Sequence, residues 1–348
     1  MANKQEYIEK MMSGDADRSL SKTAELFRQH SSPEIYKTYI PTGYKRLDEI
    51  LGGGLTPGVH YIGAISSLGK STLCIEMADS MAARGQKVVY ASLEMKKVDL
   101  TAKLVSMYTM LDVAPRFSPP GIHGTVDVKD PAVMSMAKSS NMLTNADIAS
   151  HNTSDDWKLI EKCAETVANH GKNINILESM TRPMSVDDIE LYLEGYVEKY
   201  GVSPVVFVDY LQILAPAKAV ERCTDKQVAD YNVAKFRMLA SKFNTPIVVI
   251  SSFNRSGYDT PVSMQDFKET GNIEYSADTL IGLQLKGVGT SGFDANEAKR
   301  KYPREVELVI LKQRYGRTGD KIDYLFSTTY NFFDELPAST SAPVKRKI

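Results

Sequence analysis

The stretch that decides the fold is YIGAISSLGKSTLCIEMADSM, residues 61–81. Its first residues are apolar and strand-like, and its last residues have the composition of a helix. Between them, GAISSLGKST (63–72) is rich in glycine and serine. A strand, such a turn and a helix in this order are the context in which a P-loop binds phosphate. Backbone amides point at the anion there, and the helix dipole favours negative charge. The sequence therefore predicts a phosphate loop.

Individual residues of this loop have expected roles. Gly69 permits the tight turn, Lys70 reaches the β- and γ-phosphates, and the hydroxyl of Ser71 is a ligand for Mg²⁺. The first glycine of the G-x4-GK-[ST] pattern falls at Ala64, with Gly63 one position earlier. An ordinary strand–helix turn is the alternative, which the flanking strand and helix disfavour. The predicted nucleotide contacts are Ser66, Ser67, Leu68, Gly69, Lys70, Ser71 and Thr72.

Two carboxylates follow apolar, strand-like runs. PVVFVDYLQIL places Asp209 at the end of a buried strand, where an unpaired charge is costly. Coordination of Mg²⁺ explains this carboxylate, and capping of the following turn is the alternative. KVVYASLEMKK places Glu94 at the end of a second strand, which we expect beside the strand of the phosphate loop. There Glu94 would act as the general base that polarises the attacking water. A solvated glutamate is the alternative.

Strand-like and helix-like segments alternate from Ile40 onward. Short runs that are apolar on both faces belong to a buried, largely parallel sheet covered by helices. The sequence thus predicts an α/β fold, with a doubly wound, mainly parallel sheet and helices on both faces. After residue 300, two β-rich runs around YGRTGD predict a C-terminal antiparallel hairpin at the sheet edge. The predicted parallel strands are 61–66, 87–94, 204–214, 246–253 and 279–285.

We divide the chain into three regions: an arm or linker helix at 1–37, the main domain at 38–336 with an insertion at about 111–156, and a disordered basic tail at 337–348. In the arm, Leu20, Ala24 and Phe27 recur at helical spacing. Such a helix either lies on its own domain or docks on a neighbouring subunit, and the sequence leaves both open.

The composition is that of an ordinary globular protein, with 43% hydrophobic and 24% charged residues and a formal net charge of −1. With no global basic field, contact with nucleic acid would need a local patch. The three cysteines lack CxxC spacing, which argues against a disulfide framework or a zinc site. The polar N-terminus and the absence of long apolar windows predict a cytoplasmic protein without a membrane partner.

The chain resembles one family, the DnaB-type replicative helicases within the RecA-like ATPases. The resemblance runs from about residue 38 to 333 and implies a RecA-like P-loop ATPase that uses ATP and Mg²⁺. The family's helical N-terminal domain has no counterpart in the sequence, so we expect a compact, phage- or plasmid-like form. The motifs are PTGYKRLDEILGGGLTPG, GAISSLGKST, SLEM, VDYLQIL, SSFNRS, FKETGNIEYSADTLIGL and LKQRYGRTGD, in family order.

The resemblance implies that Lys312 and Arg314 act in trans, on the nucleotide site of a neighbouring subunit. An arginine finger of this kind stabilises charge in the transition state. Without the family match, both residues would be interpreted as an exposed basic edge at a hairpin turn. The family usually has Gln at the position of Ser252, so coupling between the γ-phosphate and the DNA loop is expected to differ here.

The segment 254–271 resembles the family's loop that faces single-stranded DNA, and it suits phosphate contacts from side chains and backbone amides. The segment 218–226 matches a second channel loop, for which a solvated loop is the alternative. The candidate DNA contacts are Arg255, Lys268, Glu269 and Gly271.

Together these expectations describe an ATP-dependent, homohexameric DNA helicase motor that translocates on single-stranded DNA during replication. A primase or a helicase loader would be a further partner. Two alternatives stay open: a RecA-like recombinase or mediator that forms filaments, and a regulatory ring ATPase without unwinding activity. The FKETGNIE segment favours the helicase, whereas the near-neutral charge is compatible with a regulatory ring.

Overall fold

The computed structural model describes residues 38–114, 128–179, 182–253, 259–267 and 272–337, and three positions near residue 25. Residues 39–348 form one compact unit and residues 1–38 another. The first of these units contains the whole sheet. The predicted tail beyond residue 337 and most of the predicted arm lie outside the described residues.

The described part of the unit contains a nine-stranded sheet of order β3-β2-β4-β5-β1-β6-β7-β8-β9. The strands from β3 to β6 in this order run parallel, and β7, β8 and β9 continue the sheet antiparallel. This confirms the predicted α/β class and the C-terminal antiparallel hairpin. The bounds are β1 Gly58–Ala64, β2 Val88–Ser92, β3 Ile174–Glu178, β4 Val205–Asp209, β5 Pro246–Ser252, β6 Thr279–Leu285, β7 Arg304–Gln313, β8 Lys321–Ser327 and β9 Phe332–Glu335.

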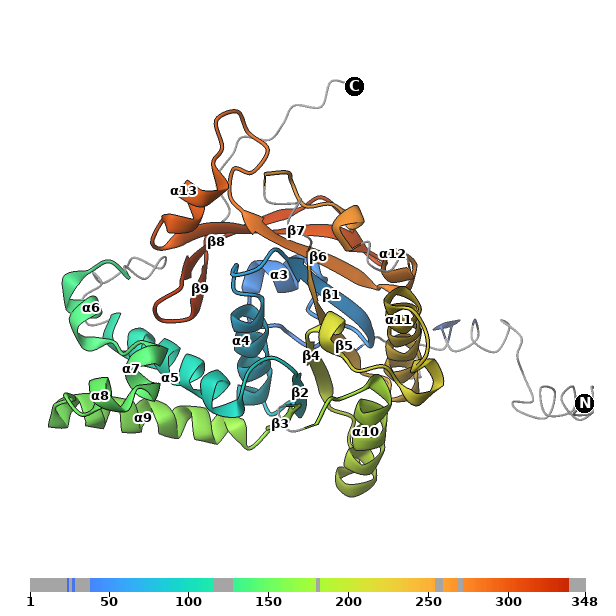
Figure 1. Ribbon diagram of the computed structural model, residues 1–348, viewed down its shortest axis with the longest axis horizontal. Helices are drawn as coiled ribbons and strands as arrows, with labels where there is room; N and C mark the ends of the chain where they lie inside the picture. Colours follow the sequence, from blue (N-terminus) through green and yellow to red (C-terminus); the bar gives the residue numbers. More distant parts are fainter. Residues whose placement is uncertain are drawn as a thin grey trace, which may run out of the picture. The chain divides into compact units, whose positions relative to one another are not determined.

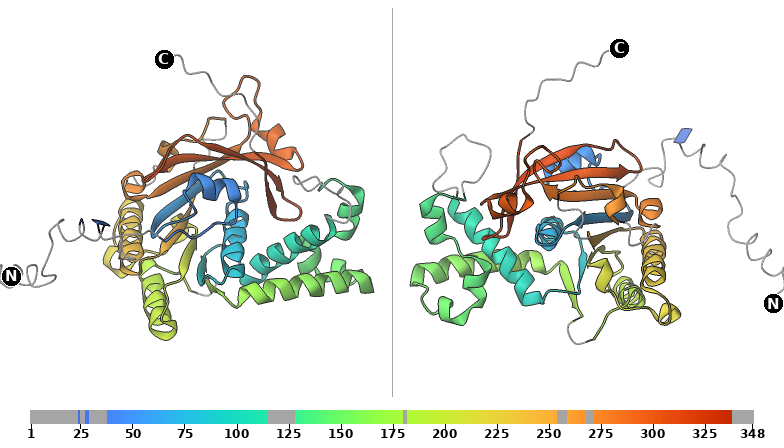
Figure 2. Two further views of the ribbon diagram at one scale, coloured as in Figure 1. Left: turned by 180° about the vertical axis from the view of Figure 1, so that it is seen from behind. Right: turned by 45° about the horizontal axis from the view of Figure 1, so that its top comes forward.

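Helices cover both faces of the sheet: α4, α5 and α9 lie on one side and α10 and α11 on the other (Figures 1 and 2). Among the described residues, no helix is long and apolar enough to cross a membrane. The bounds are α3 Lys45–Ile50, α4 Lys70–Ala83, α5 Lys97–Val113, α6 Pro131–Met136, α7 Ser140–Thr144, α8 Ala146–Ala149, α9 Ser154–Gly171, α10 Val186–Tyr200, α11 Asp225–Lys242, α12 Asn272–Ser276 and α13 Ala295–Arg300, with 3-10 turns at Leu211–Ile213, Lys218–Val220 and Met264–Phe267.

Local sequence explains where the long helices begin. Thr153, Ser185 and Thr224 each start a helix with a capping box, in which the hydroxyl accepts from the third helical amide and that residue's side chain accepts in return. The strands between the helices are apolar on both faces, and β1, β2, β4 and β5 are almost entirely buried. The core therefore lies along the middle of the sheet.

The predicted neighbour of the loop strand is wrong. We expected the strand before Glu94 to lie beside β1, but β4 and β5 lie between β1 and β2. Glu94 also lies two residues beyond the end of β2, which ends at Ser92. The cause is the long crossover through α4, because hydrophobic pattern does not specify which position in a parallel sheet a strand takes.

Residues 128–156 of the predicted insertion form three short helices, α6 to α8, before α9 begins. The Lys138 ammonium lies 2.6 Å from a carboxylate oxygen of Asp156 in the first turn of α9. The hydroxyl of Thr109, on α5, accepts from the Lys138 backbone amide at 2.9 Å. These contacts join the segment to α5 and α9.

Candidate active site

The phosphate loop connects the carboxyl end of β1 to the first turn of α4. Ser67 has φ 66° and Gly69 has φ 93°, both in the left-handed region. A Cβ at Gly69 would lie 2.7 Å from the ring of Phe326 and 2.8 Å from that of Phe333. Glycine is thus required at position 69 both by the backbone and by close packing against β8 and β9.

Lys70 extends back over the loop that precedes it. Its ammonium donates to the carbonyls of Ala64 and Ile65, at 3.0 and 3.2 Å. Burial lowers the pKa of Lys70 to about 8, and the nearby carboxylates of Asp209 and Glu94 oppose this shift. Lys70 is therefore a partly desolvated cation that lies close to both predicted acidic residues.

Asp209 is buried at the end of β4, with 1% of its surface exposed. The Tyr90 hydroxyl donates to its Oδ2 at 3.0 Å, whereas Oδ1 has no hydrogen-bond partner among the described residues. Burial raises the pKa of Asp209, and the hydroxyls of Ser71 and Tyr90 oppose that shift. A buried carboxylate oxygen of this kind needs a cation or a proton.

Ser71 and Asp209 fit a Mg²⁺ site, because Mg²⁺ prefers oxygen ligands and takes one or two from the protein and the rest from phosphates and water. Among the described residues, no cluster of three or more His, Cys, Asp or Glu could hold a metal ion by itself. A cation here would thus depend on a bound nucleotide. The assignment of both residues as metal ligands stays a prediction.

Glu94 reaches the same edge of the sheet as Asp209. In the β2–β4 register Ser92 lies opposite Asp209, and the Leu93 amide donates to the Asp209 carbonyl at 2.9 Å. The Ser92 hydroxyl donates to the Met95 carbonyl at 2.6 Å, which closes the turn around Glu94. Glu94 is exposed to solvent. The structure thus brings Lys70, Asp209 and Glu94 together although β2 is not next to β1.

Sequence reasoning missed Gln212, which follows Asp209 by three residues. Its side-chain amide donates to the Ser251 hydroxyl at 3.0 Å and the Ser252 carbonyl at 3.3 Å, and it accepts from the Ser252 amide at 3.2 Å. Gln212 therefore joins the ends of β4 and β5, beside the position where the family usually has Gln. A glutamine within the otherwise apolar run VDYLQIL was the available signal.

Lys312 and Arg314 lie at the opposite edge of the sheet from the loop of their own chain. Gln313, between them, is in register with Thr279, which pairs with His60 near the start of β1. The loop starts beyond Ala64, roughly 13 Å further along β1 at about 3.3 Å per residue. The structure therefore does not bring these two residues to the site of their own chain.

Both basic residues have partners within the chain. Arg314 Nη1 lies 3.0 Å from Asp278 Oδ1, and the Lys312 ammonium donates to the Glu274 carbonyl at 2.5 Å. Asp278 Oδ2 also accepts from the Val59 amide at 2.9 Å, so this carboxylate is fixed to the start of β1. The guanidinium of Arg314 is bound through one nitrogen, and 34% of its side chain is exposed. Asp278 therefore orients Arg314 and leaves part of it accessible.

The candidate DNA contacts Arg255, Lys268, Glu269 and Gly271 lie outside the described residues and stay predictions. The second predicted channel loop, 218–226, is a 3-10 turn followed by the start of α11, and nearly all of it is exposed. A solvated loop and a DNA contact are both compatible with that exposure.

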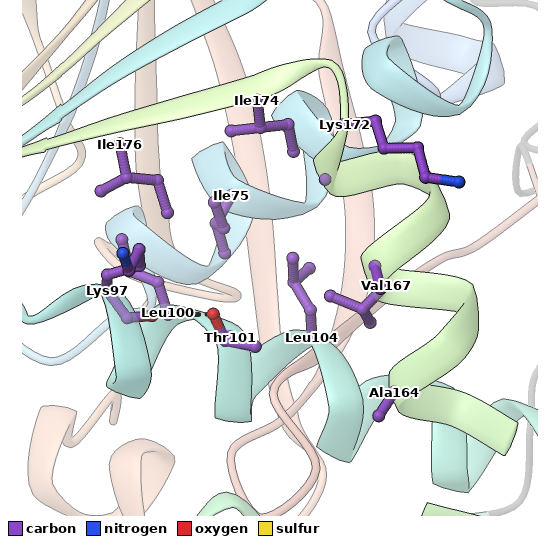
Figure 3. Close-up of a pocket in the computed structure, with 12 residues that line it drawn as sticks. Ile75, Lys97, Leu100, Thr101, Leu104, Ala164, Val167, Lys172, Ile174 and Ile176 are labelled. Carbon is purple, nitrogen blue, oxygen red and sulfur yellow. Dashed lines mark hydrogen bonds between the residues drawn. The ribbon is translucent and has the colours of Figure 1, made fainter. Parts of the chain in front are cut away.

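A separate apolar pocket of about 430 Å³ lies between α5 and α9. Figure 3 shows Leu100 and Leu104 facing Val167, with Ile75 and Ile174 completing the wall. None of the predicted site residues lines it. The candidate active site is therefore the loop at the sheet edge and not this pocket.

The strand order, the loop after β1 and the carboxylate at the end of β4 define a P-loop NTPase domain of the RecA-like type. The chain belongs to the DnaB-like helicase C terminal domain family, whose model matches residues 39–118 and 126–335. This confirms the resemblance to DnaB-type helicases.

Curated relatives include the replicative DNA helicase DnaB of Leifsonia xyli subsp. xyli, 25% identical over 304 residues, which covers 86% of this chain and 56% of that protein. The replicative DNA helicase DnaB of Helicobacter pylori is 24% identical over 331 residues, with coverages of 86% and 60%. The chain thus spans between half and two thirds of the length of these relatives.

Two solved structures share the fold. One is an isolated ATPase domain, which superposes with a TM-score of 0.71 at 21% identity, covering 92% of this chain and all of that one. A structure of a DnaB-like replicative helicase and its interactions with primase gives a TM-score of 0.69 at 22% identity, covering 94% and 70%. At this identity the likeness confirms the RecA-like fold.

Proposed function

We propose that this chain is the ATP-driven motor of a DNA helicase, which assembles into a ring and moves along single-stranded DNA. The carrying observation is the division of the predicted catalytic residues between two edges of one sheet. Lys70, Asp209 and Glu94 lie together at the carboxyl edge, whereas Lys312 and Arg314 lie at the other. A complete site on this arrangement needs two copies of the chain.

At the carboxyl edge, each residue has a step that its position supports. Lys70 exchanges its contacts with the Ala64 and Ile65 carbonyls for phosphate oxygens. Ser71 and Asp209 hold Mg²⁺, which neutralises charge on the β- and γ-phosphates when bound. Glu94, exposed beside Asp209, accepts a proton from the attacking water.

At the opposite edge, Arg314 reaches the γ-phosphate of a neighbour, held in orientation by Asp278. Hydrolysis then depends on assembly, since the stabilising guanidinium comes from another subunit. We infer a homohexamer, as in the family resemblance, with single-stranded DNA in contact with the segment 254–271. Primase and a helicase loader are the further partners to test, because one solved relative is described with its interactions with primase.

Binding of Mg–ADP is expected to weaken as pH rises above about 8. A bound phosphate favours the charged form of Lys70, whose pKa is about 8 in the free chain, so binding above that pH takes up a proton. Affinity should be constant below pH 8 and fall above it by up to tenfold per unit, which titration calorimetry measures. Lys70→Arg, which stays charged, should remove the dependence. A flat wild-type profile would contradict the assignment of Lys70.

The helicase proposal is tested by the ATPase rate of the wild-type chain with and without single-stranded DNA. A motor on DNA should hydrolyse ATP faster when DNA is present, and the stimulation should fade as salt screens the phosphate contacts. Hydrolysis that is indifferent to DNA would favour a regulatory ring ATPase. Extended filaments instead of closed rings in electron micrographs would favour a recombinase.

A further inference from the structure

Arg304, the first residue of β7, contacts the phosphate loop of its own chain. Its Nη1 donates to the Ser67 carbonyl at 2.7 Å. Its Nε and Nη2 donate to the Lys299 carbonyl in α13, at 3.1 and 2.8 Å. All three guanidinium nitrogens are therefore engaged, and the group forms a planar bridge between the last turn of α13 and the loop.

The contact falls on the peptide that joins Ser67 to Leu68. In a planar trans peptide the carbonyl and the following N–H point in opposite directions. When Arg304 holds the Ser67 carbonyl outward, the Leu68 amide is directed toward the inside of the loop. Successive amides that converge in this way form an anion-binding nest. A contact outside the loop thereby fixes a donor inside it.

The Ser67 backbone gives Arg304 something to hold. Ser67 has φ 66°, which residues with a Cβ adopt at a cost, so the peptide needs support to stay in this orientation. Phe326, opposite Arg304 in the β7–β8 register, presses its ring against Gly69. The antiparallel strands thus support two successive parts of the loop, one through a guanidinium and the other through an aromatic ring.

We propose that Arg304 is a positioning residue of the phosphate loop, which orients the Ser67–Leu68 peptide so that its amide binds the β-phosphate. The inference rests on the proposed role of the loop in nucleotide binding. It adds a function for β7, which carries Lys312 and Arg314 at its other end. One strand then contacts the nucleotide site of its own subunit at its first residue and extends toward the neighbour's site at its last.

The test compares Arg304→Gln with Arg300→Gln, which removes the same charge from an exposed position at the end of α13. Affinity is measured with fluorescent ADP and Mg²⁺. We expect Arg304→Gln to bind roughly tenfold more weakly, the order of a hydrogen bond to a charged group, and Arg300→Gln to bind as the wild type does. KM for ATP should rise by a similar factor while kcat at saturation changes little. Wild-type affinity in Arg304→Gln, or equal losses in both variants, would overturn the proposal.

A second variant separates orientation of the peptide from support of α13. Ser67→Gly loosens the peptide, so the loss caused by Arg304→Gln should be larger in the glycine background than in the wild type. If Arg304 only supports α13, the two losses add independently. Additive losses overturn the proposal. A wild-type chain that binds no ADP overturns the assignment of the loop itself, a result distinct from normal binding by Arg304→Gln.

Discussion

A mixture of two inactive variants, Lys70→Ala and Arg314→Ala, is expected to hydrolyse ATP. Each variant alone lacks one half of every site. In a mixed ring, an Arg314→Ala subunit provides an intact loop and a Lys70→Ala neighbour provides an intact finger. At equal amounts with random assembly, about a quarter of the sites should be complete, each recovering the roughly 10³-fold or larger contribution of the finger.

The structural reason is the separation of Arg314 from its own phosphate loop. Gln313 is in register with the start of β1, and the loop follows the far end of that strand. Arg317→Ala, in the same exposed turn, is the matched control and should hydrolyse ATP normally. If the mixture stays inactive while native mass spectrometry shows mixed rings, Arg314 does not complete a neighbour's site. If Arg314→Ala alone stays active, the finger assignment is wrong.

The fold was predictable because its strands are buried on both faces. The runs around β4 and β5 are apolar at nearly every position, which only a covered parallel sheet accommodates. β3, in contrast, was missed. It is an edge strand whose side chains are half-exposed or exposed, so INILE lacks the continuous apolar pattern. The long run after residue 320 was read as one segment, whereas a turn at 328–331 divides it into β8 and β9.

The candidate site was predictable residue by residue but not in its geometry. Lys70, Asp209 and Glu94 were found because each lies at the end of an apolar run, and carboxyl ends of parallel strands share one edge. The order of those strands depends on crossover topology, which local pattern does not encode. Long-range contacts, such as Arg304 on the Ser67 carbonyl, had no sequence signal either, since 237 residues separate the partners.

Glu94→Gln is expected to abolish most ATP hydrolysis while nucleotide binding persists. The amide keeps the shape of the side chain but cannot accept a proton from water. A positioned general base contributes about 10²–10⁴-fold, and kcat should fall within that range. KM and the affinity for Mg–ADP should change little, because Lys70 and the loop are intact. Single-turnover hydrolysis and fluorescent ADP binding measure the two effects separately.

The exposure of Glu94 is what makes this variant informative. An exposed side chain, held beside Asp209 by the Leu93 amide, can be changed without opening the core. Glu198→Gln, the same change on the exposed surface of α10, should hydrolyse ATP as the wild type does. Loss of ADP binding in Glu94→Gln would mean that the residue holds nucleotide or metal. Near-normal hydrolysis would move the base elsewhere and leave Glu94 as a solvated residue at the sheet edge.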